Sequence, residues 1–584
     1  MCGIVGYVGN KDAIPFLISG LKRLEYRGYD SAGIATLNGG NITVIKAEGK
    51  INNLVPLTKT CSGKIGIGHT RWATHGAAKQ KNAHPHLSKN GTFAIVHNGI
   101  IENCDRLKDF LVERGFTFNS DTDSETIAHL LEYYYDGSVF DAITKAASVL
   151  IGSFAIGVLC KHEQKLYAIK KDSPLVVGLS IESNYISSDM QTLLNNTHDF
   201  YILDNNEIAV IDDRVTVFDL NGKQIKKSVY HAKNEVKTAE KDGFSYFMLK
   251  EIYEQPRAIS DTLAELKRKP LPFSTDINDI HIVGCGSAYH AALMGKYFIE
   301  SICDCRVTAD IASEFRYRNP ILRPNDLLLA ISQSGETADT IGALNLGVGK
   351  CNTACIVNVP ESTLTRVATP IYTKAGPEVA VATTKGFITQ LVNLYAIAAF
   401  LLKSKHDERF IELKSEIQNL PTYVTQTLKV GALTQRLGQI IAPHDYAFFI
   451  GRGADYAAAK ESALKLKEIS YIHADCYPAG ELKHGTISLI EKGSIVVAIA
   501  TDEALLDKTV SNIVEVKARG AFVIGISCFD ISSVCDEVVR IPKTKFVSPL
   551  LATIASQLLA FYTALLRGCD IDKPRNLAKS VTVE

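Results

Sequence analysis

The second residue of the chain is a cysteine, and its position gives it a chemistry that the other cysteines lack. If Met1 is removed, as a small second residue usually permits, Cys2 carries both a thiol and a free α-amine. The reference pKa values of these groups are about 8.5 and about 7.7–8.0. One residue would then supply a nucleophile and a base, as in enzymes with an N-terminal threonine. A cysteine at this position can also be incidental, so the prediction depends on the motifs that follow.

Later motifs in the first third of the chain combine residues that suit catalysis on an amide. Residues 69–76 (HTRWATHG) contain an arginine, the only tryptophan and two histidines, and Asn98 and Gly99 follow the apolar stretch 93–96. An asparagine amide and a glycine N–H at a strand end can form an oxyanion hole. Asp123 lies where a helix is expected to begin, and an aspartate there is usually only a helix cap.

In this order the motifs resemble those of the class II, or N-terminal nucleophile, glutamine amidotransferases. They are CGIVGYVG, LEYRGYDSAG, GHTRWATHG, NAHPH, HNGIIEN and SDTDSE, and together they extend over about the first 200 residues. The resemblance implies that Cys2 is the nucleophile and that Asn98 and Gly99 form the oxyanion hole. It also implies that Arg71 binds the α-carboxylate of glutamine and Asp123 its α-ammonium group, which suits a guanidinium and a carboxylate. The remaining substrate-binding residues implied by these motifs are Trp72, Thr74, His75 and His84.

Residues 331–337 (ISQSGET) predict a different chemistry in the later part of the chain. They follow the apolar stretch 327–330 and open a helix, so three hydroxyls, a glycine and free helix N–H groups come together. Such a turn suits a phosphate dianion, although it can also be an elaborate helix cap. It is not a P-loop, because no GxxxxGK[ST] occurs. Residues 284–289 (GCGSAY) lack the third glycine of the dinucleotide fingerprint, which argues against NAD binding.

Acid–base chemistry is predicted from one helix and the loop after it. Glu461, Lys465 and Glu468 share a face at 3.6 residues per turn, which by itself indicates either a salt-bridged surface or a site. His484 follows in the segment GELKHG. A buried carboxylate with an imidazole is the usual equipment for moving a proton beside a carbonyl. The C-terminal segment 572–584 contains Lys579 and reads, by composition, as a solvated end.

The elements that must position these residues fall into two styles. Residues 1–215 alternate short strands with helices such as 13–24 and 123–135, which predicts a layered α+β domain. Residues 221–243 are charged and lack apolar periodicity, so we expect a linker there. Beyond it, β–α alternation repeats: Gly284 and Gly451 are 167 residues apart, while Ala330 and Ala498, and Cys355 and Val523, are 168 apart. We therefore predict two copies of an α/β domain with a parallel sheet, which bind ligands at the carboxyl ends of strands.

The repeated half resembles the paired sugar-isomerase (SIS) domains and tail of the glutamine–fructose-6-phosphate aminotransferase (isomerizing) family. The matching segments are GCGSAYHA, SQSGETADT, ALKLKEISYIHADCYPAGELKHG and DKPRNLAKSVTVE. The resemblance implies that Glu468 moves a proton between C1 and C2, that His484 helps to open the sugar ring, and that Lys579 lies at the sugar carbonyl, with a Schiff base left open. It implies a phosphate site made of Ser332, Gln333, Ser334 and Thr337, and further substrate contacts from Ser287, Thr383 and Lys465. Ala288, Thr383 and Thr486 depart from the family pattern and leave the fine sugar preference open.

Composition adds limits to this interpretation. The chain has 584 residues, 46% apolar and 22% charged, with 63 basic and 63 acidic side chains, so its charge gives no reason to expect nucleic-acid or membrane binding. No apolar run reaches the eighteen or more residues of a membrane span, and residues 1–16 lack the basic region of a secretory signal. The 13 cysteines have no CxxC pair, so we expect reduced thiols in a cytoplasmic protein.

The sequence thus predicts a layered N-terminal nucleophile domain (2–215), a linker (216–250), two α/β SIS domains with parallel sheets (251–410 and 411–570) and a tail (571–584). The expected reaction converts L-glutamine and D-fructose 6-phosphate to L-glutamate and D-glucosamine 6-phosphate. The resemblance implies no metal, PLP or nicotinamide, a homodimer, and a passage for ammonia formed by Trp72 and the tail. The alternatives are a glutamine-dependent enzyme acting on another substrate, such as a related keto-sugar phosphate or phosphoribosyl pyrophosphate, and a non-enzymatic sensor of sugar phosphates.

Overall fold

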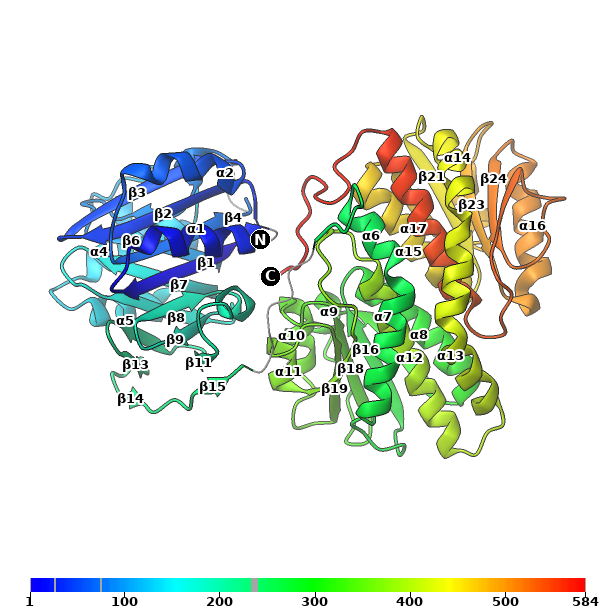
Figure 1. Ribbon diagram of the computed structural model, residues 1–584, viewed down its shortest axis with the longest axis horizontal. Coiled ribbons are helices and arrows are strands. Elements are labelled where there is room, and N and C mark those ends of the chain that lie inside the picture. Colours follow the sequence, from blue (N-terminus) through cyan, green and yellow to red (C-terminus); the bar gives the residue numbers. More distant parts are fainter. Residues whose placement is uncertain (1, 26–27, 74–75, 233–239, 583–584) are drawn as a thin grey trace. The chain divides into compact units, whose positions relative to one another are not determined.

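The computed structural model describes residues 2–25, 28–73, 76–232 and 240–582. The chain divides into two compact units, Met1–Val236 with Ser580–Glu584, and Lys237–Lys579 (Figure 1). All 13 cysteines lie in the described residues, and all of them are free thiols.

The first unit contains two antiparallel sheets among its described residues. The first sheet has the spatial order β15 (Tyr230–His231), β11 (Asp199–Ile202), β9 (Val176–Leu179), β10 (Ser183–Ser187), β1 (Gly3–Gly9), β4 (Ile65–Arg71), β2 (Ser31–Asn38) and β3 (Asn41–Glu48). The second has the order β14 (Gln224–Ile225), β13 (Val215–Phe218), β12 (Ile208–Ile211), β8 (Leu166–Lys171), β7 (Gly152–Cys160), β6 (Phe93–Ile101) and β5 (His86–Leu87).

Side-chain alternation along the strands makes this unit four layers thick. Ile4 and Val8 of β1 enter the core between the sheets, whereas Val5 and Tyr7 pack on the outer side, where α1 (Ala13–Leu24) lies. In β6 the outer residues pack in the same way against helices of the opposite face, as period-2 alternation requires. These helices are α3 (Cys104–Val112), α4 (Ser124–Tyr134) and α5 (Val139–Val149); the short α2 (Ile51–Leu54) follows β3.

The observed elements agree closely with the expected ones, except in the predicted linker. The predicted helices 13–24 and 123–135 match α1 and α4 to within one residue at each end. Residues 221–243, expected to be a linker, instead contain the two-residue strands β14 and β15 on the edges of the two sheets. Edge pairing uses backbone N–H and C=O groups and needs no apolar pattern, so composition did not reveal it.

The second unit holds two parallel five-stranded sheets of identical topology. One has the order β17 (Arg306–Ile311), β16 (Asp279–Gly284), β18 (Leu327–Ser332), β19 (Asn352–Val357) and β20 (Thr369–Tyr372). The other has the order β22 (His473–Pro478), β21 (Tyr446–Gly451), β23 (Ile495–Ala500), β24 (Phe522–Ser527) and β25 (Glu537–Arg540). The fold prediction of a layered domain followed by two α/β domains is confirmed.

Helices complete the two α/β domains. Those of the first repeat are α6 (Phe247–Tyr253), α7 (Gln255–Arg268), α8 (Ser287–Cys303), α9 (Ala312–Phe315), α10 (Ala338–Asn345), α11 (Thr363–Val367) and α12 (Lys385–Ser404). Those that follow are α13 (Arg409–Thr427), α14 (Gly431–Ile441), α15 (Ala454–Ser470), α16 (Leu506–Lys517) and α17 (Ser548–Leu566).

The internal repeat is visible in backbone detail, and it corrects one predicted equivalence. Gly286 before α8 has φ 55° and ψ −127°, and Gly453 before α15 has φ 56° and ψ −127°. Ala330 pairs with Cys355, but its counterpart Ala498 pairs with Gly525, so the residue equivalent to Cys355 is Gly525 and not Val523. The connection between β23 and β24 is two residues longer than the one between β18 and β19. The sequence comparison missed this difference because the strands on either side are similarly apolar.

Two helices, α12 and α17, are long and apolar enough to cross a membrane by length and composition. Of their most apolar windows, 89% and 78% respectively is buried inside the protein. They are therefore central helices of the second unit, which explains their apolar character on all sides.

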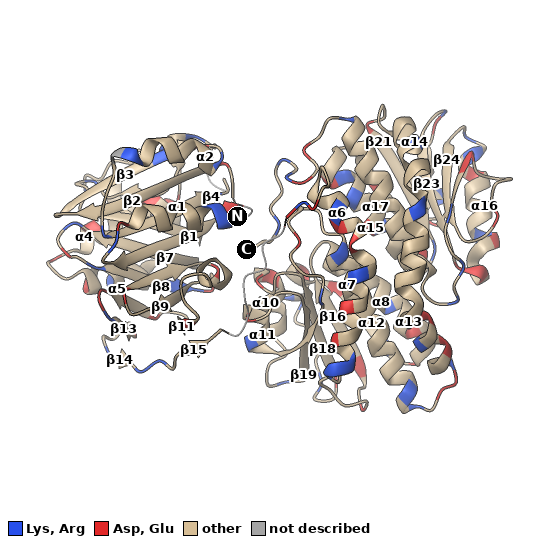
Figure 2. Ribbon diagram, viewed as in Figure 1, with Lys and Arg blue, Asp and Glu red and all other residues tan. Residues whose placement is uncertain are grey.

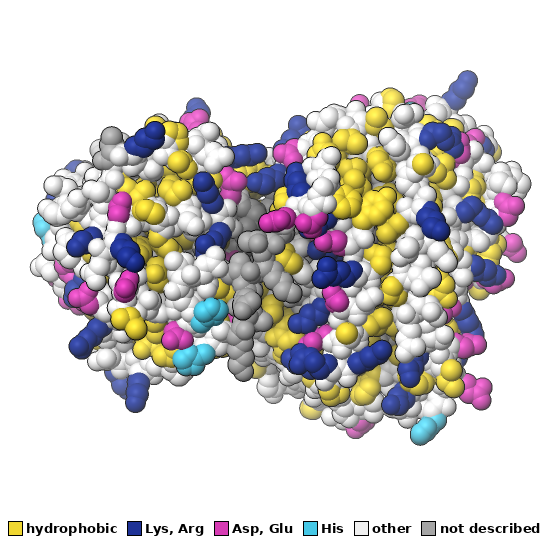
Figure 3. Space-filling model, in the orientation of Figure 1, with side chains coloured by type: hydrophobic (Ala, Val, Ile, Leu, Met, Phe, Trp, Pro, Cys, Tyr) yellow, Lys and Arg dark blue, Asp and Glu magenta, His cyan; other side chains and the backbone are white. Residues whose placement is uncertain are grey.

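Basic and acidic residues are interspersed along the ribbon of each unit (Figure 2). The face seen in Figure 3 likewise mixes basic and acidic side chains within each unit.

Candidate active sites

The Cys2 thiol is held by the backbone of Trp72. Its Sγ accepts from the Trp72 N–H at 3.4 Å and lies 3.6 Å from the Trp72 carbonyl oxygen. Burial raises the pKa of the Cys2 thiol, while the Trp72 N–H and the Arg71 guanidinium act in the opposite direction. A thiol with a raised pKa needs a base to become a nucleophile. The Trp72 ring packs edge-on against Tyr29, with centroids 5.5 Å apart.

Asn98 points its amide toward Cys2, and a histidine fixes that orientation. The Asn98 Nδ2 donates to the Cys2 carbonyl oxygen at 3.1 Å, while Asn98 Oδ1 lies 3.1 Å from His69 Nε2. His69 Nε2 is also 3.0 Å from the His97 carbonyl oxygen. Because both neighbours of Nε2 are acceptors, this nitrogen carries the proton. His69 therefore keeps the Asn98 oxygen turned away from Cys2 and the amide donor turned toward it.

Gly99 occupies a position in β6 where no larger residue fits. Its φ of +136° is a conformation that other residues rarely adopt, and a Cβ would overlap the carbonyl oxygen of Ser153. The sequence had suggested that Asn98 and Gly99 lie at the end of a strand. The strand continues to Ile101, so both residues lie within β6. The local backbone departs from a regular strand at Gly99, where it can turn an N–H toward a ligand.

Arg71 and Asp123 are buried charged residues beside Cys2. Arg71 ends β4, and its guanidinium donates to the carbonyl oxygens of Gly76 and Ala77 at 3.0 and 3.2 Å. Asp123 occupies the N-cap position of α4, but its carboxylate makes no capping bond and instead accepts from the Ile101 N–H at 2.9 Å. The interpretation of Asp123 as an ordinary cap is therefore wrong.

Two buried histidines, His69 and His84, pack against each other beside this site. His84 is buried and accepts from the His97 N–H, and its ring stacks on that of His69 with centroids 4.0 Å apart. Burial lowers the pKa of His69 to about 3, so the ring is neutral and can serve as a fixed donor. Thr74 and His75, also predicted to bind substrate, lie outside the described residues.

The predicted phosphate turn joins β18 to α10 at the carboxyl edge of the first parallel sheet. The Ser332 hydroxyl lies 2.9 Å from that of Thr337 and accepts from the Gly335 N–H at 3.0 Å. Ser334 accepts from the Glu336 N–H at 3.1 Å. Strands β16 and β18 are neighbours whose connections leave in opposite directions, which is where such sheets bind ligands.

Gln333 adds a further sign of a ligand at this turn. Its side-chain oxygen is buried and has no hydrogen-bond partner among the described residues. A buried polar atom is normally paired, so a ligand hydroxyl is a natural partner for it.

A buried ionic network joins the two repeats. Lys465 donates to Glu468 at 2.8 Å and to the Ser287 hydroxyl at 3.1 Å, and it lies 3.4 Å from Glu461. Glu461 accepts from Ser287 and from His290 Nδ1, each at 2.8 Å. The side chains of Lys465 and Glu461 are 1% and 0% exposed, so this face of α15 is no salt-bridged surface.

The sequence reasoning missed His290 as a member of this network and used Glu461 only as a neighbour on the helix. The i, i+4, i+7 spacing of Glu461, Lys465 and Glu468 could have indicated the acidic partner. Nothing in the sequence connects His290 on α8 with a helix 171 residues away.

Lys579 is held by a buried carboxylate that the sequence did not suggest. Its Nζ lies 2.5 Å from Glu378 Oε2, which also accepts from Thr383 Oγ1 at 2.6 Å. Glu378 Oε1 accepts from the N–H groups of Thr384 and Gly386 and so caps α12. Although burial favours the neutral acid, Lys579 and these donors hold the pKa of Glu378 well below its usual range. Glu378 is therefore an ionised carboxylate that accepts from the Lys579 side chain.

Glu251 lies near the same cluster. Its Oε1 accepts from the Val379 and Ala380 N–H groups, while its Oε2 is buried without a partner among the described residues. Burial, and then the neighbouring Glu378 carboxylate, raise the pKa of Glu251. Of the two carboxyl groups, Glu251 is therefore the one that more readily keeps a proton, while Glu378 stays ionised.

His484 stands apart from these groups. It ends a short 3₁₀ turn, Leu482–His484, and its side chain is exposed. No hydrogen bond connects its side chain to the phosphate turn, the Lys465 network or Lys579 in the described part of the chain. Its predicted role in ring opening is therefore not supported by contacts within this one chain.

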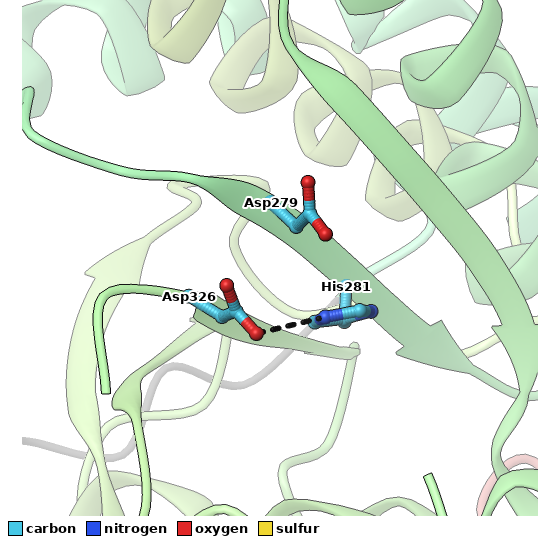
Figure 4. Close-up of side chains that lie close together, drawn as sticks. All are labelled: Asp279, His281 and Asp326. Atoms are coloured by element: carbon cyan, nitrogen blue, oxygen red, sulfur yellow. Dashed lines mark ion pairs between the residues drawn. The ribbon is translucent and has the colours of Figure 1, made fainter. Parts of the chain in front are cut away.

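A second polar cluster lies at the opposite edge of the first parallel sheet, where Asp279, His281 and Asp326 gather (Figure 4). His281 Nε2 is 3.5 Å from Asp326 Oδ2. Asp279 already faces the guanidinium groups of Arg306 and Arg323 at 3.3 and 3.6 Å. Asp279 is therefore already engaged in ion pairs with these two arginines.

Fold and sites together define a chain with a glutamine amidotransferase domain and two SIS domains. A family model described as a glutamine amidotransferase domain matches residues 69–195, and one described as a SIS domain matches residues 275–400 and 440–567. The glutamine–fructose-6-phosphate aminotransferases (isomerizing) of Clostridium tetani and Caldanaerobacter subterraneus are 48% and 49% identical to this chain over 608 residues, which cover all of each protein. The chain therefore belongs to the glutamine–fructose-6-phosphate aminotransferase (isomerizing) family.

One solved structure agrees with this assignment. The C-terminal domain of glucosamine-fructose-6-phosphate aminotransferase from Francisella tularensis is 38% identical and covers 57% of this chain and 100% of its own length, with a TM-score of 0.55.

Proposed function

We propose that this chain transfers the side-chain nitrogen of L-glutamine to D-fructose 6-phosphate and isomerises the product, giving L-glutamate and D-glucosamine 6-phosphate. The observation that carries the proposal is the combination, in one chain, of Cys2 beside an oriented Asn98 amide with the buried Lys465–Glu468 pair of the SIS domains. A sensor of sugar phosphates needs no nucleophile, and an amidotransferase for other substrates needs no SIS pair. Its test is a direct assay for glucosamine 6-phosphate formed from glutamine.

In the first half-reaction, the Cys2 thiolate attacks the carbonyl carbon of the glutamine side chain. The α-amine of a mature N-terminal Cys2 takes the thiol proton. Asn98 Nδ2 and the Gly99 N–H stabilise the oxyanion, ammonia leaves, and water then hydrolyses the γ-glutamyl thioester to glutamate. Arg71 and Asp123 hold the α-carboxylate and α-ammonium group of glutamine, and Trp72 and His84 lie beside the pocket. Thr74 and His75, also predicted to bind glutamine, lie outside the described residues.

In the second half-reaction, ammonia condenses with the C2 carbonyl of the open sugar, and water leaves. Glu468 removes a proton from C1 and returns it to C2, which turns the ketose imine into the amino aldose. Ser287 and Lys465 surround the reacting carbons, and Thr383 holds the carboxylate that positions Lys579. Lys579 lies at the carbonyl oxygen of the sugar, and its hydrogen bond to Glu378 sets the position of the amine there.

We place the phosphate of the sugar at the turn of Ser332, Gln333, Ser334 and Thr337. Ser334→Ala should raise KM for fructose 6-phosphate roughly 10- to 100-fold, because a hydrogen bond to a charged group contributes about 1.5–3 kcal/mol. Glutamine hydrolysis without sugar should stay unchanged. Ser260→Ala is the matched control, because this exposed serine on α7 bonds only the Pro256 carbonyl among the described residues. An unchanged KM for Ser334→Ala would place the phosphate elsewhere.

We also propose that the protein is a cytoplasmic homodimer. Tyr253 on α6 and Leu565 and Leu566 on α17 are large apolar side chains with 40%, 37% and 46% exposure, and the two helices pack together. Figure 3 shows apolar side chains gathered over the region where Figure 1 labels these helices. Such patches mark interaction sites. Light scattering should give twice the mass of 63.7 kDa, and Leu566→Glu should shift the protein to monomer. A wild-type mass of one chain would refute the dimer.

A further inference from the structure

His290 belongs to no motif assigned above, yet it completes the buried network beside Glu468. It lies at the end of the first turn of α8, in the first repeat, and its side chain is 12% exposed. Its Nδ1 is 2.8 Å from Oε2 of Glu461, which lies on α15 of the second repeat and is fully buried. The contact therefore joins the two helices that carry Ser287 and Glu468.

The direction of each hydrogen bond in this network follows from the charge of Glu461. Burial favours the neutral acid, but Lys465, His290 and Ser287 outweigh it and lower the pKa of Glu461. An ionised carboxylate only accepts, so His290 Nδ1 and the Ser287 hydroxyl are both donors. Ser287 in turn accepts from Lys465, which leaves the Lys465 ammonium directed at Glu468.

We propose that His290 is a positioning residue for proton transfer, which acts by holding Glu461 so that Lys465 keeps its hydrogen bond to Glu468. The inference rests on the proposed function, because it assumes that Glu468 moves the sugar proton. The two carboxylate oxygens of Glu461 accept hydrogen bonds from different donors, Oε2 from His290 and Oε1 from Ser287.

The physical reason is competition between two carboxylates for one ammonium. Lys465 is 2.8 Å from Glu468 and 3.4 Å from Glu461, so the nearer partner is Glu468. Without the His290 donor, Glu461 has an unpaired buried oxygen, and a buried charge without a partner is strongly unfavourable. Among the described residues Lys465 is the cation in contact with Glu461, and it would move toward that carboxylate and away from Glu468.

The alternative is that His290 only provides a hydrogen-bond partner for the buried Glu461 carboxylate and thereby stabilises the fold. The two interpretations differ in what a changed residue does to the chemistry. Stabilisation alone predicts a lower melting temperature with normal turnover of the folded protein. Positioning predicts a slower proton transfer in protein that is fully folded and still binds the sugar.

The test compares His290→Phe with His290→Asn in the full chain. Asparagine retains an N–H donor bonded to Cγ, where histidine has Nδ1, whereas phenylalanine retains only the ring. The measurement is incorporation of solvent deuterium into fructose 6-phosphate at C1, followed by NMR in the absence of glutamine. We expect kcat of exchange to fall about 10- to 100-fold in His290→Phe with KM little changed, and to recover to within about threefold of wild type in His290→Asn.

His281→Asn provides a matched control, since it alters a buried histidine of the same domain that contacts Thr308 and not the network. Exchange at the wild-type rate in folded His290→Phe would overturn the inference. Equal loss in His290→Phe and His290→Asn would overturn it as well, because the donor would then be irrelevant. Absence of exchange in wild-type protein would instead refute the proposed role of Glu468, on which the inference depends.

Discussion

Replacing Cys2 by alanine should reduce the glutamine-dependent synthesis of glucosamine 6-phosphate to background. The Cys2 sulfur is the atom that would form the thioester, and alanine offers no nucleophile in its place. The fold of the first unit should survive, because the side chain is small and its sulfur contacts only the Trp72 backbone among the hydrogen bonds of the described residues. Synthesis is measured by the appearance of the amino sugar under saturating glutamine and fructose 6-phosphate.

Two further measurements make the Cys2 prediction specific. The Cys2→Ala protein should still catalyse deuterium exchange into fructose 6-phosphate, because Glu468 and Lys465 belong to the other unit. Cys61→Ala, at a half-buried cysteine of the first unit, should retain full synthesis. A glutamine-like electrophile should label the wild-type protein once, at a mature N-terminal Cys2. Amino-sugar formation from glutamine by Cys2→Ala would overturn the assignment of the first unit.

Glu468→Gln is the second change with a large expected effect. Glutamine has nearly the same size and can still accept a hydrogen bond from Lys465, but it cannot take a proton from C1. General acid–base catalysis contributes about 10²- to 10⁴-fold, so kcat for synthesis should fall by that factor. KM for fructose 6-phosphate should change little, because the phosphate turn is untouched. Glutamine hydrolysis by the first unit should continue.

The control for Glu468→Gln is Glu491→Gln, an exposed glutamate of the same domain. Both variants should bind fructose 6-phosphate with wild-type affinity in a titration. Full synthase activity in Glu468→Gln would exclude Glu468 as the proton carrier. A large effect of Glu491→Gln would show that any loss of charge in this domain slows the enzyme.

Local sequence patterns predicted much of the fold. The apolar spacing of residues 13–24 predicted α1 correctly, and the glycines at 284 and 451 revealed the repeat because both lead directly from a strand into a helix. The edge strands β14 and β15 escaped notice because each pairs through only two residues. The two-residue shift before β24 was not predicted, because the central strands of such sheets are all apolar. One apolar strand can therefore be aligned with another in more than one register.

The sites were predictable only as far as motifs extend. Cys2, Asn98 and Asp123 stand in recognisable segments, and the structure brings Asn98 to within 3.1 Å of Cys2. Partners fixed by tertiary folding left no local trace. Glu378 and Lys579 are 201 residues apart, and only the fold brings the carboxylate and the ammonium together.

The predicted alternatives for α15 illustrate the same limit. Glu461, Lys465 and Glu468 are spaced as they would be on an exposed, salt-bridged helix face. Burial against α8 distinguishes the two cases, and burial depends on a helix of the other repeat. Helical periodicity thus predicted the shared face but could not predict what covers it.

The central claim is that nitrogen passes from the glutamine side chain to the sugar within one protein. The most direct measurement supplies glutamine labelled with ¹⁵N at its side-chain amide, together with fructose 6-phosphate, and analyses the products by mass spectrometry. The account predicts glucosamine 6-phosphate that carries ¹⁵N, formed in a one-to-one ratio with glutamate. Release of labelled ammonia and glutamate with no labelled amino sugar would contradict it.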